Sequence, residues 1–287
     1  MRRLWLALLL GAACAPSGSA PSPAPAPPYQ PSPGPQPEAT PSSPGLKLRN
    51  SGRYRYALGQ RDSVVAQMPS GEAQEQVSGR TAYLTVTLQP SGTGALYEAV
   101  VDSIHADPDV TLPGIEVDGA RGARFTGNLS ATGWLEGLTG ARRSNLLDQI
   151  RDQLNLMFPV LPPDGARPGL TWTAAAAAVP ARLSVVDLNE TVDAKGSAQG
   201  EELIAGERVL PVDVVRTTAG KGTGSQVGQD LDLETTGVDS LSYRLAADGR
   251  VVSAEGISTK SYTISVRAVG QTVPVTQLRR VTFTLLK

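Results

Sequence analysis

Residues 241–256, LSYRLAADGRVVSAEG, decide the fold class of this chain of 287 residues. Asp248 and Gly249 stand between two apolar runs, and such a pair is typical of a tight β-hairpin turn, whose backbone needs a positive φ. The stretch therefore predicts two antiparallel strands joined by a turn at these two residues.

The chain after this hairpin keeps an alternating pattern. In SYTISVRAVGQTVPVTQLRRVTFTLL, residues 261–286, apolar and polar side chains alternate on either side of a turn near Gly270. The apolar positions are Tyr262, Ile264, Val266, Val281, Phe283 and Leu285. Successive side chains of a strand point to opposite faces of a sheet, so we expect an antiparallel meander with one dry and one wet face.

The N-terminal half is also typical of strands. RTAYLTVTLQ, residues 80–89, alternates apolar with polar residues, and ALYEAVVDSIHA, residues 95–106, is a second extended stretch. In GARFTGNLSATGWLEG, residues 122–137, the glycines indicate bulges or tight turns.

One segment has the period of a helix. In SNLLDQIRDQLNLMFP, residues 144–159, the apolar residues recur three and four positions apart. They are Leu146, Leu147, Ile150, Leu154, Met157 and Phe158. Ser144 is a suitable N-cap and Pro159 ends the pattern, so we expect an amphipathic helix over about 144–158.

These elements predict an α+β fold that is mostly antiparallel β. We expect a long-stranded curved sheet or half-barrel with one main amphipathic helix, about 144–158, over residues 46–287. The alternative is two lobes, about 46–140 and 160–287, joined by that helix. The alanine run 174–178 favours helix by propensity and strand by its neighbours, so its structure stays open.

The N-terminus predicts export. Arg2 and Arg3 precede an apolar run, Leu4 to Leu10, which is far shorter than the ~20 apolar residues of a membrane-spanning helix. Such a segment is typical of a signal peptide, and we expect it to comprise residues 1–13.

The stretch LGAAC, residues 10–14, resembles the lipobox of bacterial lipoprotein precursors, with leucine more usual at Gly11. The resemblance implies that Cys14 is lipidated, with palmitate or similar acyl chains, and that the signal is cut just before it. More than one acyl chain gives a stable membrane anchor. Cys14 is the only cysteine, so no disulfide can form within the chain.

Residues 14–45 are expected to form a disordered, Pro-rich tether between the lipid anchor and the folded domain. A docking site for a partner that binds polyproline is the alternative. Ala15 follows the cysteine, where aspartate is the usual inner-membrane retention signal of enteric lipoproteins. We therefore predict a cell-envelope location, with the outer membrane facing the periplasm preferred in a host with two membranes.

Charge and chemistry exclude several functions. The formal net charge is −1 without a basic stripe, which disfavours nucleic acid as a partner. His105 is the only histidine, and no nucleophile elbow is present. Asp107, Asp109, Glu116 and Asp118 do not have the spacing of a calcium loop. We predict no catalytic residues, no metal and no cofactor.

The order of elements is similar to that of periplasmic lipoprotein carriers and LppX-like lipoproteins. This resemblance implies a half-barrel around an acyl-chain cavity. We therefore predict a non-catalytic binding domain for an acyl chain or other apolar ligand. Its candidate ligand-binding residues are Trp134, Leu146, Ile150, Leu154, Met157, Phe158 and Trp172.

Ordinary core packing is the alternative reading of the same side chains. The alternative function is a structural or scaffold lipoprotein that docks an envelope protein through its sheet face or edge. A hydrolase is the third hypothesis.

Overall fold

The structure is a computed structural model, and it describes residues 44–68, 70–108, 114–140, 144–183, 186–226 and 229–286. The fold is mostly antiparallel β with few helices, as predicted. The helices are α1 (Gly114–Ala120) and α2 (Asn145–Leu154). The strands are β1 (Gly52–Gln67), β2 (Ala73–Ser91), β3 (Gly94–Ala106), β4 (Arg124–Leu129), β5 (Leu135–Gly140), β6 (Thr171–Leu183), β7 (Val186–Ala198), β8 (Glu202–Ile204), β9 (Glu207–Gln226), β10 (Gln229–Ala246), β11 (Val251–Val266) and β12 (Gln271–Leu286).

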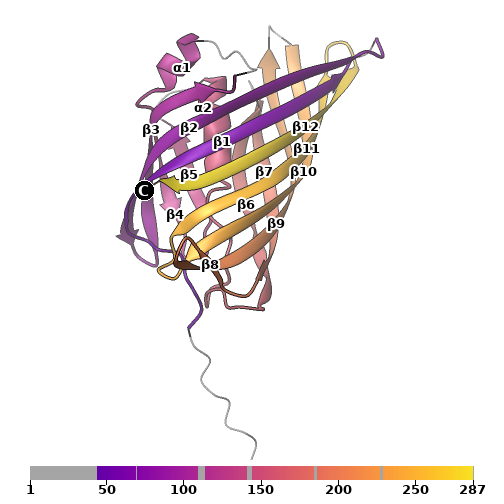
Figure 1. The fold of residues 1–287 in the computed structure, drawn as a ribbon. Helices are drawn as coiled ribbons and strands as arrows, with labels where there is room; N and C mark the ends of the chain where they lie inside the picture. Colours follow the sequence, from indigo (N-terminus) through magenta and orange to yellow (C-terminus); the bar gives the residue numbers. More distant parts are fainter. Residues whose placement is uncertain are drawn as a thin grey trace, which may run out of the picture. The chain divides into compact units, whose positions relative to one another are not determined.

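Within the described residues, all the strands belong to one sheet. Its order is β5-β4-β3-β2-β1-β12-β11-β10-β9-β7-β6, and β8 pairs with β9 beside this path. The first and last strands are neighbours, with Arg55 opposite Leu286. The sheet curves into a nearly closed barrel shape (Figure 1). Residues on both sides of α2 therefore contribute to a single sheet.

The predicted hairpin is present as β10 and β11. Gly249 has a φ of 81°, and the Ala246 amide donates to the Arg250 carbonyl at 2.9 Å. A side chain at Gly249 would also collide with the incoming chain, because its Cβ would lie 2.1 Å from the Lys47 carbonyl oxygen. Glycine is therefore required at this turn for its backbone conformation and for space.

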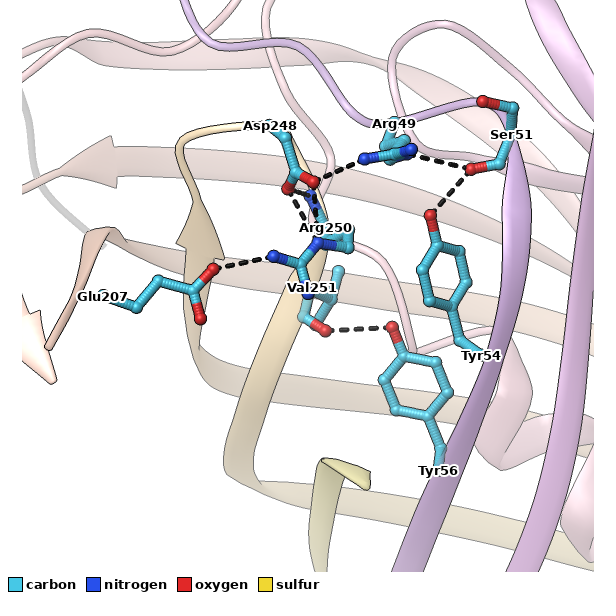
Figure 2. Close-up of polar contacts among 8 residues, drawn as sticks. All are labelled: Arg49, Ser51, Tyr54, Tyr56, Glu207, Asp248, Arg250 and Val251. Carbon is cyan, nitrogen blue, oxygen red and sulfur yellow. Dashed lines mark hydrogen bonds and ion pairs between the residues drawn. The ribbon is translucent and has the colours of Figure 1, made fainter. Parts of the chain in front are cut away.

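A polar cluster joins this turn to the start of the domain (Figure 2). Arg49 donates to Asp248 at 2.5 Å, and Arg250 binds Asp248 at 2.7 Å and Glu207 at 2.7 Å. Below it in Figure 2, the Tyr56 hydroxyl donates to the Val251 carbonyl at 2.9 Å. These contacts fix the chain entering β1 against the β10–β11 turn.

Helix α2 begins where the sequence predicts. The Ser144 side chain accepts a hydrogen bond from the Leu147 amide at 3.2 Å, as an N-cap does. The helix ends at Leu154, earlier than predicted. The reason lies on the facing strands: the Tyr243 hydroxyl binds the Leu156 carbonyl and Arg216 binds the Phe158 carbonyl, each at 2.7 Å. Side chains of the sheet thus replace the helical partners of these carbonyls.

The main core lies on the inner face of the sheet, around α2. Its members come from both halves of the chain, and the apolar residues of the alternating pattern supply most of it. Buried examples are Leu58, Leu84, Ile150, Met157, Tyr243 and Phe283. Tyr97 and Phe158 meet edge to face at 6.0 Å between ring centroids. Helix α1 was not predicted from the sequence.

A second, smaller apolar cluster lies further along the same strands. It comprises Val186, Leu188, Leu231, Leu233 and Tyr262. Between it and the main core, the inward positions carry polar and charged side chains. The interior of the sheet is therefore layered as apolar, charged and apolar.

No helix among the described residues is both long enough and apolar enough to cross a membrane.

Candidate functional site

The two end strands of the sheet border an opening in its wall. In the described part of the chain, β5 pairs only with β4, and β6 pairs only with β7. Helix α2 contacts both end strands from the inside. We call the opening between β5 and β6 the seam.

A cavity of about 540 Å³ occupies the seam. Trp134, Leu135 and Glu136 line it on the β5 side, and residues 173–179 line it on the β6 side. Thr132 and the loop residues 161–163 complete the lining. Because consecutive residues of β6 take part, the wall on that side is the edge of a strand, including its backbone.

A second cavity of about 50 Å³ lies inside the sheet and adjoins the seam. Trp134, Leu135 and Val179 line both cavities. We call the inner cavity the charged pocket, because three acids and three bases line it. They are Asp152, Glu190, Arg216, Asp239, Lys260 and Arg279.

Lys260 and Glu190 form an ion pair that crosses two strands. The Lys260 Nζ lies 3.0 Å from both carboxylate oxygens of Glu190, although β9 and β10 separate their strands. Glycines face them in register: Gly237 opposite Lys260 and Gly220 opposite Glu190. A Cβ at Gly237 would lie 2.8 Å from the Lys260 Cγ, and one at Gly220 would lie 2.9 Å from the Glu190 Cγ. The two glycines make room for the pair.

This pairing sets the protonation of Lys260. Burial is the largest single influence and acts to lower its pKa, but Glu190, Tyr262, Asp239 and Asp152 together outweigh it, and the pKa is raised above its ordinary value. Lys260 is therefore charged at neutral pH.

Arg216 connects the charged pocket to the chain after α2. Its Nη1 donates to the Asn155 carbonyl and its Nη2 to the Phe158 carbonyl, both at 2.7 Å. The guanidinium also lies 5.4 Å from the centroid of the Trp134 ring, within the range of a cation–π contact. Trp134 is thereby held at the boundary between the seam and the charged pocket.

A third network continues the charged layer toward β2. The Asp62 carboxylate accepts from the Arg279 Nε at 3.0 Å and from the Gln60 amide at 2.5 Å, and Gln60 in turn accepts from Arg80 at 2.6 Å. Burial and, to a smaller extent, the charge on Arg279 lower the pKa of Arg80 to about 10, against the opposing effect of Asp62. Asp62 therefore pairs directly with Arg279 and is linked to Arg80 through Gln60.

Two acids at the site lack such partners within the described residues. Asp239 is 4% exposed, and its Oδ1 has no hydrogen-bond donor. Glu136 lines the seam, and its exposed side chain takes part in none of the ion pairs of the described residues. Two carboxylates and the Arg216 guanidinium, whose Nη atoms bind main-chain carbonyls, are therefore the charges without an ion-pair partner among the described residues of the site, and acids outnumber bases among them.

The predicted ligand-binding residues fall into two groups. Leu146, Ile150, Leu154, Met157 and Phe158 are at most 4% exposed and pack into the main core. The two tryptophans are partly buried: Trp172 donates from its Nε1 to the Val160 carbonyl at 3.0 Å, and Trp134 lines both cavities. Trp134 is thus the member of the predicted set that borders the seam and the charged pocket.

Sequence reasoning missed the charged pocket, although a signal was present. On β9, Arg216 points to the same inner face of the sheet as Val212 and Val214, which precede it at intervals of two residues. On β10, Asp239 points to the same face as Leu241. A charged residue at a position where the alternation of a long strand calls for an apolar one indicates a buried polar site.

Among the described residues, the other candidates from the sequence do not line the seam. Cys14 and Asp109 lie outside the described residues. His105 packs edge to face on Tyr83, with ring centroids 5.5 Å apart. Among the described residues, no group of three or more His, Cys, Asp or Glu side chains is arranged to hold a metal ion.

Comparisons of the chain with models of protein families, with curated proteins and with solved structures gave no match.

Proposed function

We propose that this chain is a lipid-anchored cell-envelope protein whose domain is a non-catalytic binding module, and that it captures an extended segment of an envelope protein in the seam. Cys14 carries the anchor, and the Pro-rich tether connects it to the domain. The observation that carries the proposal is the pair of unpaired strand edges bordering one cavity.

The backbone of β6 favours a peptide as the occupant. A strand at the end of a sheet presents a row of free N–H and C=O groups, which an added strand can pair with. Residues 173–179 line the cavity along this edge. An acyl chain lying there would leave those groups without partners, whereas an added strand satisfies them.

The side chains of β6 leave this edge accessible. Ala174 to Ala178 project no group larger than a methyl into the seam, and Ala175 and Ala176 are exposed. Pro180 follows, and a proline cannot donate to an added strand. The alanine run therefore leaves the edge of β6 open to an added strand, although the β6–β7 register shifts between Ala174 and Ala177.

Peptide selection tests the proposal. A library of short randomised peptides is selected against the full chain carrying Cys14→Ser, which removes the lipidation site. Ala176→Trp fills the seam, and Ala219→Trp, on the exposed face of β9, is the matched control. We expect peptides that bind the Cys14→Ser chain and its Ala219→Trp form but not the Ala176→Trp form.

Hydrogen exchange then distinguishes the kind of occupant. A bound strand should protect those amides of residues 173–179 that point away from β7, because they become hydrogen-bonded. Selected peptides that leave these amides unprotected, or a selection without peptides sensitive to Ala176→Trp, would contradict strand capture.

An apolar ligand is the second candidate, favoured by the lining of Trp134, Leu135, Leu161 and the alanines. Native mass spectrometry of the same protein, purified without detergent and followed by organic extraction, tests it. A stoichiometric lipid that is lost in Ala176→Trp and retained in Ala219→Trp would support this candidate over the peptide.

The anchor has its own test. Labelled palmitate should be incorporated into the wild-type chain and not into Cys14→Ser, because the thiol is the acceptor. Incorporation that persists in Cys14→Ser would contradict lipidation at this residue.

A further inference from the structure

We propose that the charged pocket receives the side chain of a lysine or arginine from the segment that adds to β6. The inference rests on the strand capture proposed above and names the residue type that the seam selects.

The geometry of β6 directs one side chain of an added strand into the pocket. Val179 lies opposite Glu190 in the β6–β7 register, and both residues line the charged pocket. Residues directly opposite each other on paired strands point to the same face of the sheet. The residue that pairs with Val179 across the seam therefore points inward, where Val179 and Leu135 border both cavities.

The cations of the charged pocket are already engaged. Lys260 is paired with Glu190, and Arg279 with Asp62. Arg216 is the register partner of Asp239, but both of its Nη atoms donate to main-chain carbonyls. Among the pocket's described cations, the Arg216 Nε is the donor left without a partner, and its guanidinium is already held through both Nη atoms, so the pocket offers an incoming anion a single donor.

The free acceptors favour a cation instead. The Asp239 Oδ1 is buried without a donor, and an unsatisfied buried carboxylate oxygen is unfavourable. The other lining acids are engaged: Glu190 by Lys260, and Asp152 by Arg151 at 3.1 Å. Glu136 adds a second free carboxylate, in the lining of the seam. A long basic side chain reaching in from the seam would give the buried Asp239 carboxylate a charge-assisted hydrogen bond.

The test compares selections on three proteins: the Cys14→Ser chain and the same chain carrying Asp239→Asn or Asp193→Asn. Asp193 is an exposed acid on the outer face of β7 and serves as the matched control. We expect one position of the selected peptides to be enriched in lysine or arginine with the first and third proteins, and the enrichment to be lost with Asp239→Asn. Near-UV circular dichroism of each variant reports whether the fold is kept.

Individual peptides give the magnitude. Replacing the enriched lysine by glutamine should weaken binding to the Cys14→Ser chain about tenfold, as expected for a charged hydrogen bond, and should have little effect with Asp239→Asn. The peptide substitution tests the inference even where Asp239→Asn perturbs folding.

The outcomes separate the two proposals. Peptides that protect β6 without preferring a basic residue, or with a preference that survives Asp239→Asn, would overturn this inference and leave strand capture intact. A selection without peptides that depend on the seam would overturn strand capture itself.

Discussion

The main core and the charged pocket lie inside the same sheet and on the same strands, yet they are built from opposite kinds of residue. On β12, Phe283 and Val281 belong to the main core, and Arg279, two positions further, lines the charged pocket. On β10, Leu241 belongs to the core and Asp239 to the pocket. Distance along the strand, and not the strand itself, separates the two regions.

The main core and the charged pocket contribute unequally to stability. Apolar burial stabilises a fold by roughly 25 cal/mol per Å². Buried ion pairs often contribute nothing beyond well-packed apolar residues of the same size. Stability therefore explains the main core but not the charged pocket, which agrees with a binding role for the pocket.

The largest effect is expected in the main core. Phe283→Ala should lower the free energy of unfolding by about 3–5 kcal/mol, because a fully buried ring leaves a cavity. Leu278→Ala on the same strand is the control: its side chain is 42% exposed, and the expected change is within about 0.5 kcal/mol. Urea denaturation measures both, and equal effects would contradict the assigned inner face of β12.

The charged pocket should respond to single and double substitutions in opposite ways. Lys260→Met leaves the buried Glu190 without its partner, so we expect a loss of about 3 kcal/mol. Adding Glu190→Leu should restore most of that loss, since no unpaired charge remains. A double variant as unstable as the single one would show that the ion pair itself stabilises the fold.

The N-cap of α2 tests the helix that packs against both regions. Ser144→Ala removes the acceptor of the Leu147 amide and should lower the free energy of unfolding by about 1 kcal/mol. Ser144→Asp, which keeps an acceptor at the same place, should retain wild-type stability in the same urea titration. An equal loss in both variants would contradict the capping role.

The smallest effect is a pH dependence. The folded pKa of Lys260 is raised, so its stabilising charge is fully present below its unfolded pKa of about 10.4 and is lost as the pH rises through the folded value. The difference in free energy of unfolding between the wild-type chain and Lys260→Met should therefore shrink above about pH 10. Urea titrations of both proteins across this range measure it, and a constant difference would contradict the raised pKa.

Local signals predicted much of the fold. The turn at Gly249, the alternation of Val281 and Phe283, and the N-cap Ser144 depend on neighbouring residues, which one sequence reveals. The end of α2 did not follow from such signals. Arg216, which donates a hydrogen bond to the Asn155 carbonyl, lies 61 residues from Asn155 in the sequence.

The site was less predictable than the fold for the same reason. The seam exists because β5 and β6 end up unpaired at the two ends of one sheet, and that depends on every other strand pairing. Trp134 was predicted as a ligand-binding residue, but its place beside Arg216 depends on the pairing of distant strands. A single sequence does not reveal which distant strands pair with each other.

The neighbouring positions of β1 and β12 set the order in which the molecule can be completed. A chain synthesised from its N-terminus exposes β1 first, and the partner of Arg55 is Leu286, at the other end of the sequence. Contacts of such large separation form slowly, and an open edge in a partly made sheet invites aggregation. Losing only the 16 residues of β12 would thus leave the edges of β1 and β11 unpaired in the middle of the sheet. The sheet is therefore continuous only once β12 has been added.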